Sequence, residues 1–230
     1  MRSGAGGEWL SPVLAAGVGV RHGRDLVLRA ASFRLDSLAA GPPSLGISTA
    51  SPDTASAVID VLAGLSRPAY GELRVLGQDL SAPRGRLAVR RQVGVARRSG
   101  LRPPPGYRIR GLVEHAARIA RLPAGDRHLL AAAIIDRLEL TAWAEVPLRS
   151  APEPVARRAR LAAAAVHEPS LLLLEGLLDD LSPRDAAALS DGIRDLGRQT
   201  AIVLTGRDPV ALSLACDDVI ALADGILVSC

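Results

Sequence analysis

The feature that most constrains the fold is an alternation of strand and helix patterns over the last third of the chain. Residues 171–174 form a short, continuously apolar run, which is typical of a strand buried on both faces. Further segments alternate after it: helix patterns at 183–196 and 209–215, and strand patterns at 201–205, 219–222 and 226–228. This alternation predicts a parallel sheet covered by helices on both faces.

The first two thirds of the chain add more strands and a block of helices. The strand patterns lie at 17–22, 25–35, 44–48, 71–77 and 93–96. The helix patterns lie at 56–65, 111–122, 127–138 and 155–167. The helical block interrupts the alternation and predicts an inserted helical lobe over about 97–167. We expect residues 1–230 to form a single domain of the α/β class.

The composition narrows the chemistry that the chain can use. The chain has 230 residues and 48% hydrophobic content, enough for a sizeable core. All 28 basic residues are arginines, so no lysine can serve a phosphate site. The net charge of +4 is modest and is typical of scattered, solvated arginines. Two cysteines fit neither a metal site nor a disulfide scaffold, and they favour a reduced, cytosolic compartment.

Four strings, taken in this order and spacing, resemble the ATP-binding subunits of ABC transporters. They are LRAASFRL at 28–35, LAGL at 62–65, GELRVLG at 71–77 and HEPSLLLL at 167–174. The resemblance covers residues from about 17 to 229. It implies a P-loop NTPase-like ABC cassette with a mixed sheet core, an N-terminal antiparallel β portion and an inserted helical lobe. These strings belong to the scaffold, so the site has to be analysed separately.

The resemblance places the phosphate-binding loop on residues 49–57, which run TASPDTASA. The corresponding positions are Thr49, Pro52, Thr54, Ala55 and Ser56. The glycines of such a loop let backbone N–H groups surround the phosphates, and its lysine reaches the β- and γ-phosphates. Here the glycines are absent, proline offers no N–H, and alanine replaces the lysine. Only Ser56 matches, as a Mg²⁺ ligand or, alternatively, as a helix N-cap.

These losses have a large expected effect on nucleotide binding. A hydrogen bond to a charged group contributes about 1.5–3 kcal/mol. Losing the lysine and a few loop donors therefore costs on the order of 5 kcal/mol, which is roughly a thousandfold in affinity.

The acidic strand end is altered as well. The family pattern of four apolar residues followed by Asp-Glu falls on 171–176, which ends in Glu175 and Gly176. Glu175 keeps a carboxylate, and together with Ser56 it is the expected ligand set if any Mg²⁺ binds. Gly176 cannot activate water. Asp179 and Asp180 follow, as surface acids or stand-in metal ligands.

The signature motif, which caps the partner subunit's ATP, falls on Ala151, Pro152, Glu153 and Pro154. Two prolines remove donors, and the carboxylate of Glu153 repels phosphate.

Three further positions change chemistry relative to the family. The Q-loop glutamine falls on Arg98, the switch histidine on Arg207, and the adenine-stacking aromatic on His22. The two arginines could converge on an anion, or they could pair with Glu175, Asp179 or Asp208. His22 is otherwise an exposed histidine. No catalytic residues are expected.

The resemblance therefore implies a degenerate ATP-binding subunit that does not hydrolyse ATP and acts as a scaffold or regulator of a membrane transporter. Two alternatives remain open. One is a divergent, active ATPase subunit that uses arginine in place of lysine. The other is an Arg-rich nucleic-acid-binding cassette built on residues 84–110, although only Tyr107 offers an aromatic for base stacking there.

The expected partners are a membrane-spanning transporter subunit and a second ATP-binding subunit, in a homo- or heterodimer. Nucleic acid is not expected. The docking surface is predicted to include residues 97–109, between the two lobes. No cofactor is expected, and ATP and Mg²⁺ are the cofactors if the site functions. The expected location is cytoplasmic, at the inner face of the cell membrane through partner subunits.

Overall fold

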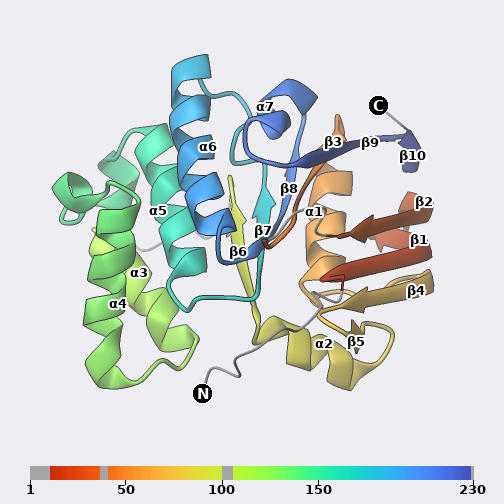
Figure 1. Cartoon of the computed structure of the whole chain (residues 1–230), viewed down its shortest axis with the longest axis horizontal. Coiled ribbons are helices and arrows are strands. Elements are labelled where there is room, and N and C mark those ends of the chain that lie inside the picture. The colour runs from red at the N-terminus through yellow and green to blue at the C-terminus, as the bar shows by residue number, and fades with distance from the viewer. Residues whose placement is uncertain (1–10, 37–40, 100–105, 229–230) are drawn as a thin grey trace.

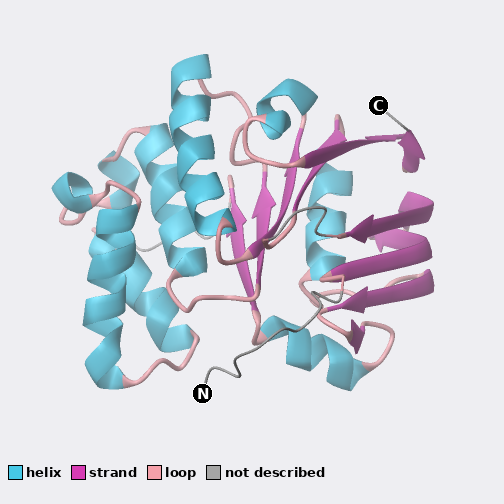
Figure 2. Cartoon of the chain, in the orientation of Figure 1, coloured by secondary structure: helices cyan, strands magenta, loops and turns pink. Residues whose placement is uncertain are grey.

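The computed structural model describes residues 11–36, 41–99 and 106–228. Within these ranges the chain forms two sheets and seven α-helices (Figure 1, Figure 2). The smaller sheet has the order β2-β1-β4-β5, with β1 (Val13–His22), β2 (Asp25–Leu35), β4 (Tyr70–Val75) and β5 (Gln78–Asp79). All of its pairings are antiparallel.

The larger sheet has the order β10-β9-β3-β8-β7-β6. Its strands are β3 (Ser44–Thr49), β6 (Val93–Arg97), β7 (Leu171–Glu175), β8 (Ala201–Gly206), β9 (Asp218–Ala223) and β10 (Ile226–Val228). The pairings are parallel except for β9 with β10. The carboxyl ends of β3, β6, β7 and β8 therefore lie at one edge of the sheet.

The helices are α1 (Pro52–Leu62), α2 (Pro83–Arg90), α3 (Ile109–Ile119), α4 (Ala124–Arg137), α5 (Glu153–Ala165), α6 (Pro183–Gly197) and α7 (Pro209–Ser213). Two 3₁₀ turns, η1 (Thr141–Trp143) and η2 (Leu148–Ser150), join α4 to α5. Figure 1 shows α1 between the two sheets, with α5 and α6 across the larger sheet and α3 and α4 beyond them.

Alternate residues of the larger sheet pack into two separate cores. On β7, Leu171 and Leu173 face α1 and the smaller sheet, whereas Leu172 and Leu174 face the other helices. All four side chains are completely buried. Successive side chains of a strand point to opposite faces, so a strand inside a three-layer arrangement has to be apolar throughout. The mixed α/β sheet class predicted from the sequence is confirmed.

Some local features differ from the sequence prediction, among them the start of β1 at Val13 instead of residue 17. Helix α1 begins at Pro52, four positions before the predicted start at Ser56. Helix α2 was not predicted, because its Arg- and Gly-containing stretch lacks a clear apolar period. Gly85 lets α2 approach β5 closely, since a Cβ at this position would lie 2.0 Å from the carbonyl oxygen of Asp79.

No helix within residues 11–36, 41–99 and 106–228 has the length and hydropathy needed to span a membrane.

Candidate functional site

Among the predicted site residues, Arg98, Glu175 and Arg207 lie where β6, β7 and β8 end. The parallel register sets Arg97 beside Glu175, and Glu175 beside Thr205. Arg98 and Arg207 directly follow β6 and β8. In open α/β sheets this edge is where ligands bind, so its side chains determine what the chain can hold.

The connection from β3 to α1 is a short helix-capping turn. Ser51 is the N-cap residue: its hydroxyl accepts a hydrogen bond from the Thr54 N–H at 3.2 Å. The Ser51 carbonyl accepts one from the Ala55 N–H at 3.0 Å. Pro52 suits the first helical position, because an N–H at this position would have no hydrogen-bond acceptor within the helix. The Thr54 and Ala55 N–H groups thus have partners within the chain rather than pointing toward a phosphate.

The alternative assignment of Ser56 as a helix N-cap is wrong, since Ser51 fills that position and Ser56 lies within α1. The Ser56 hydroxyl instead donates to Oε1 of Glu175 at 2.6 Å. Arg97 donates from Nη1 to the other oxygen of Glu175 at 2.6 Å, and from Nη2 to Asp60 on α1. One guanidinium therefore links the end of β6 to β7 and to α1.

This arrangement does not fit a Mg²⁺ ion held by Ser56 and Glu175. Mg²⁺ requires oxygen ligands in nearly ideal octahedral geometry. The Glu175 carboxylate, whose side chain is 14% exposed, is already occupied on one oxygen by a hydroxyl and on the other by a guanidinium. In the part of the chain that the structure describes, no cluster of three His, Cys, Asp or Glu side chains could hold a metal ion.

Arg98 and Arg207 converge, but they converge on a carboxylate of the chain itself. Arg98 Nη1 lies 2.5 Å from Oδ2 of Asp180, and Arg207 donates to Oδ1 of the same carboxylate. The hydrogen bond from Arg207, and to a lesser extent that from Arg98, holds the pKa of Asp180 below its usual range. Arg207 also lies near Asp179, with Nε 3.7 Å from Oδ2. Neither arginine pairs with Glu175 or Asp208; Asp208 caps α7 through the Val210 N–H.

Gly176 has a conformational role in the turn after β7. Its φ of +61° lies in the left-handed region that disfavours most side chains. Its N–H donates to the carbonyl of Thr205 at 2.8 Å. A Cβ at this position would lie 3.1 Å from a carboxylate oxygen of Asp179. Any side chain at position 176 would therefore strain this turn.

The predicted signature positions form the start of α5. Ala151 is the C-cap residue that follows η2, Pro152 is the N-cap residue of α5, and α5 begins with Glu153 and Pro154. The Glu153 carboxylate accepts a hydrogen bond from Nε of Arg157 at 2.8 Å. These residues build a local ion pair instead of presenting donors to a phosphate.

Arg157, which the sequence analysis did not single out, is only 2% exposed. It donates to the carbonyls of Leu177, at 3.0 Å, and Asp179. This buried guanidinium ties the start of α5 to the turn after β7.

His22 and Thr49 lie at the ends of β1 and β3. The His22 ring is about half exposed, and its Nε2 lies 3.9 Å from a carboxylate oxygen of Asp53. Thr49 is buried, and its hydroxyl accepts a hydrogen bond from the Ser51 N–H at 3.3 Å. Both side chains have partners within the chain.

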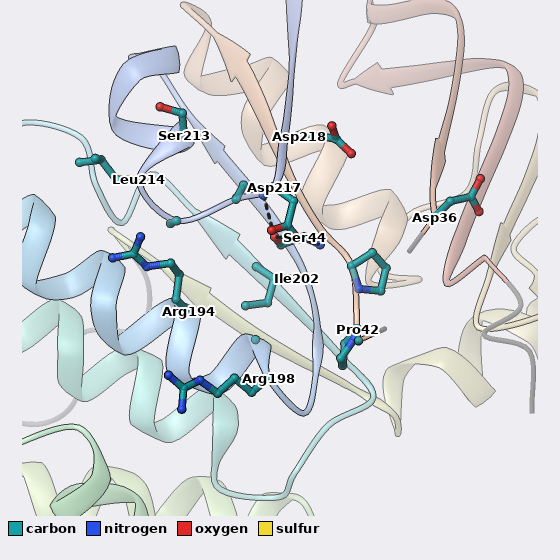
Figure 3. A pocket seen from close by; sticks show the side chains of 15 residues that line it. Asp36, Pro42, Ser44, Arg194, Arg198, Ile202, Ser213, Leu214, Asp217 and Asp218 are labelled. Atoms are coloured by element: carbon teal, nitrogen blue, oxygen red, sulfur yellow. Dashed lines mark hydrogen bonds between the residues drawn. The ribbon is translucent and has the colours of Figure 1, made fainter. Parts of the chain in front are cut away.

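A cavity of about 650 Å³ lies at the opposite end of the larger sheet, beside the first residues of β3 and β8 (Figure 3). Ser44 and Ile202 line it, and the Ser44 hydroxyl donates to Asp217 at 2.7 Å (Figure 3). Arg194 of α6 and Arg198, the C-cap residue that follows this helix, form another part of its wall (Figure 3). This cavity lies away from all of the predicted site residues.

Comparison with solved structures identifies the fold. CbiO1 from Clostridium perfringens, part of the ABC transporter complex CbiONQ, superimposes with a TM-score of 0.81. The superposition covers 95% of this chain and 87% of CbiO1, at 14% identity. The chain has the fold of an ABC ATP-binding cassette. A chain of an inward-facing, metal-chelate type ABC transporter matches this cassette with a TM-score of 0.77 and 17% identity, over 95% and 82% of the two chains.

Sequence comparison leads to the same group of proteins. The cassette is 25% identical over 177 residues to the methionine import ATP-binding protein MetN 2 of Burkholderia mallei and to that of Burkholderia pseudomallei. The match covers 75% of this chain and 44% of each relative, so the cassette spans less than half their length. No family model matches it. The predicted resemblance to ABC transporter ATP-binding subunits is confirmed.

Arg97 was not predicted as a site residue, because the family resemblance places the Q-loop position on the neighbouring Arg98. Strand order was the missing information. β6 and β7 are parallel neighbours, and Arg97 and Glu175 are the last residues of these strands. The parallel register therefore places the arginine beside the glutamate. Asp60 could have been found from its place on α1, one helical turn beyond Ser56.

Proposed function

We propose that this cassette is a non-hydrolysing subunit of an ABC transporter complex, in which it acts as a scaffold or regulator. The observation that carries the proposal is the network of Ser56, Glu175, Arg97 and Asp60. Here the chain's own guanidinium pairs with both carboxylates, Glu175 and Asp60, beside the family's metal position. A nucleotide with bound Mg²⁺ would have to break these contacts before it could form its own.

The capping turn before α1 supports the same proposal. The phosphate loop of an active cassette presents successive N–H groups to the nucleotide. Here the Thr54 and Ala55 N–H groups bond to Ser51, and residue 52 is a proline. The chain also lacks any lysine that could approach the β- and γ-phosphates.

The start of α5 extends the proposal to a second nucleotide site. In head-to-tail dimers of the family, the signature of one subunit completes the site of the other. Pro152, Glu153 and Pro154 offer a carboxylate and few donors there. We infer that pairing with an intact subunit would weaken both composite sites, which favours a structural or regulatory role.

The partners follow from the proposed role. We infer a membrane-spanning subunit that docks near residues 97–109, and a second ATP-binding subunit is compatible with the fold. Residues 100–105 of this predicted surface lie outside the described part of the chain. Binding to such a partner would place the cassette on the cytoplasmic side of the cell membrane.

ATP turnover by the purified chain tests the proposal. We expect phosphate release from MgATP to equal that of the double variant Ser56→Ala, Glu175→Gln, because neither residue has a metal to hold. A matched sample with the membrane subunit present tests the assembled state. Turnover in either sample that the double variant abolishes would instead support a divergent, active ATPase.

A further inference from the structure

We propose that Arg98 and Arg207 form a binding site for a phosphoryl oxyanion, and that Asp180 occupies this site as an internal ligand. The inference deepens the proposed function by naming what fills one part of the degenerate site and which chemical class would replace it. The inference rests on the proposed function, because it takes the site of the unmodified chain to hold no nucleotide.

Three separate elements bring these side chains together. Arg98 follows β6, Arg207 follows β8, and Asp180 lies in the turn between β7 and α6. Each oxygen of the Asp180 carboxylate meets a different guanidinium: Oδ2 lies 2.5 Å from Arg98 Nη1, and Oδ1 accepts from Arg207 Nη2. The carboxylate is thus held between two cations, as a bound anion would be.

The backbones that carry both arginines are anchored independently of Asp180. The Arg98 N–H donates to the Glu175 carbonyl at 2.9 Å, and the Arg207 N–H donates to Oδ1 of Asp179 at 2.9 Å. Removing the Asp180 carboxylate would therefore leave the backbones of Arg98 and Arg207 in place, with their guanidiniums next to each other. They would then lack their shared anion while remaining close enough to bind another.

The cluster is accessible from solvent. The side chains of Arg98, Asp180 and Arg207 are 39%, 50% and 48% exposed. A small ion can therefore reach the guanidiniums without unfolding the chain, and rotation of the Asp180 side chain is enough to vacate the site.

The charges favour a phosphoryl group over a second carboxylate. With Asp179 and Asp180 present, two guanidiniums face two carboxylates and the cluster is neutral. Without the Asp180 charge it carries a net positive charge, and a phosphoryl group offers more oxygens and more charge than a carboxylate. The Asp180 carboxylate is tethered beside both guanidiniums, so in the unmodified chain a free phosphate ion has to displace an intramolecular ligand.

Two variants separate the charge of Asp180 from its backbone conformation. Its φ is +58°, in the left-handed region. Asp180→Asn keeps the side-chain shape, and asparagine tolerates this region; Asp180→Gly removes the side chain at a φ that glycine adopts readily. The matched control is Asp191→Asn, which removes an exposed aspartate paired with Arg194 on α6.

The measurement is calorimetric titration with inorganic phosphate at constant ionic strength, with thermal unfolding without phosphate as the folding control. We expect both Asp180 variants to bind phosphate at least about tenfold more tightly than the unmodified chain and the Asp191 control. Adding Arg207→Ala to Asp180→Gly should abolish the gain. Unchanged affinity in both folded variants, or a gain that survives Arg207→Ala, would overturn the proposal.

The outcome is independent of the test of the proposed function. MgATP turnover concerns the unmodified chain, whereas the phosphate titration concerns the difference that the Asp180 charge makes. If the unmodified chain turns over MgATP and the Asp180 variants bind phosphate no more tightly than it does, both proposals are contradicted. If there is no MgATP turnover and no increase in phosphate affinity, only the anion-site proposal is contradicted.

Discussion

At the scale of single residues, the candidate site is a set of charges that the chain balances internally. Arg97 pairs with both Glu175 and Asp60, while Arg98 and Arg207 share Asp180. Removing one member of a partly buried ion pair leaves the other without compensation, which costs more than the pair itself contributes. The stability of this site is therefore expected to depend on Arg97.

We expect Arg97→Ala to lower the free energy of unfolding by roughly 1–3 kcal/mol. Glu175 and Asp60 would lose their shared guanidinium, although both keep some contact with solvent. Urea denaturation measures the change. Arg34→Ala is the matched control, because it breaks an ion pair with Asp36 whose members are 61% and 39% exposed. Equal effects of the two substitutions would contradict the role assigned to Arg97.

His167 provides a pH-dependent test. Burial lowers its pKa below the usual 6.5, partly offset by a hydrogen bond with the Val93 backbone. The unfolded chain therefore binds the proton more readily than the folded chain, and stability falls as the pH drops below about 6.5. We expect His167→Gln to reduce the loss of stability between about pH 7.5 and about pH 5.5, measured by urea unfolding at each pH. An unchanged loss would exclude His167 as a cause; His128→Gln, which removes an exposed histidine, is the control.

At the scale of elements, Ser51 caps the start of α1. Ser51→Ala should lower the free energy of unfolding by about 1 kcal/mol, because the Thr54 N–H would lose its capping oxygen. Ser213→Ala at the exposed end of α7 should change it by less than about 0.5 kcal/mol. Both values are accessible from urea denaturation. A Ser51 effect as small as that of Ser213 would mean that the cap does not hold this helix start.

The elements differ in how well the sequence predicts them. The fully apolar run of β7 and the periodic pattern of α6 depend on burial, which the sequence encodes directly, and both occur where predicted. The start of α1 depends on a serine cap and a proline that lie where the family has a loop, so the resemblance misplaced it. The pairing of Arg97 with Glu175 depends on which strands are neighbours, and local sequence does not contain that information.

At the scale of the whole molecule, the chain keeps the fold of an ABC cassette, whereas the residues at its ligand-binding edge differ from the family pattern. Two cores on opposite faces of the larger sheet preserve the cassette fold at 14–17% identity to its structural matches. At the ligand-binding edge of the same sheet, guanidiniums and carboxylates pair with one another. Under the proposed function, the fold persists without the interactions that a nucleotide would supply.

Direct binding of MgATP to the purified, unmodified chain tests that claim most simply. Calorimetry at millimolar nucleotide, with thermal unfolding in parallel, should give no binding heat and no stabilisation, because the amides and cations of the site already have partners within the chain. Binding in the micromolar range, with a matching rise in the unfolding temperature, would contradict the claim.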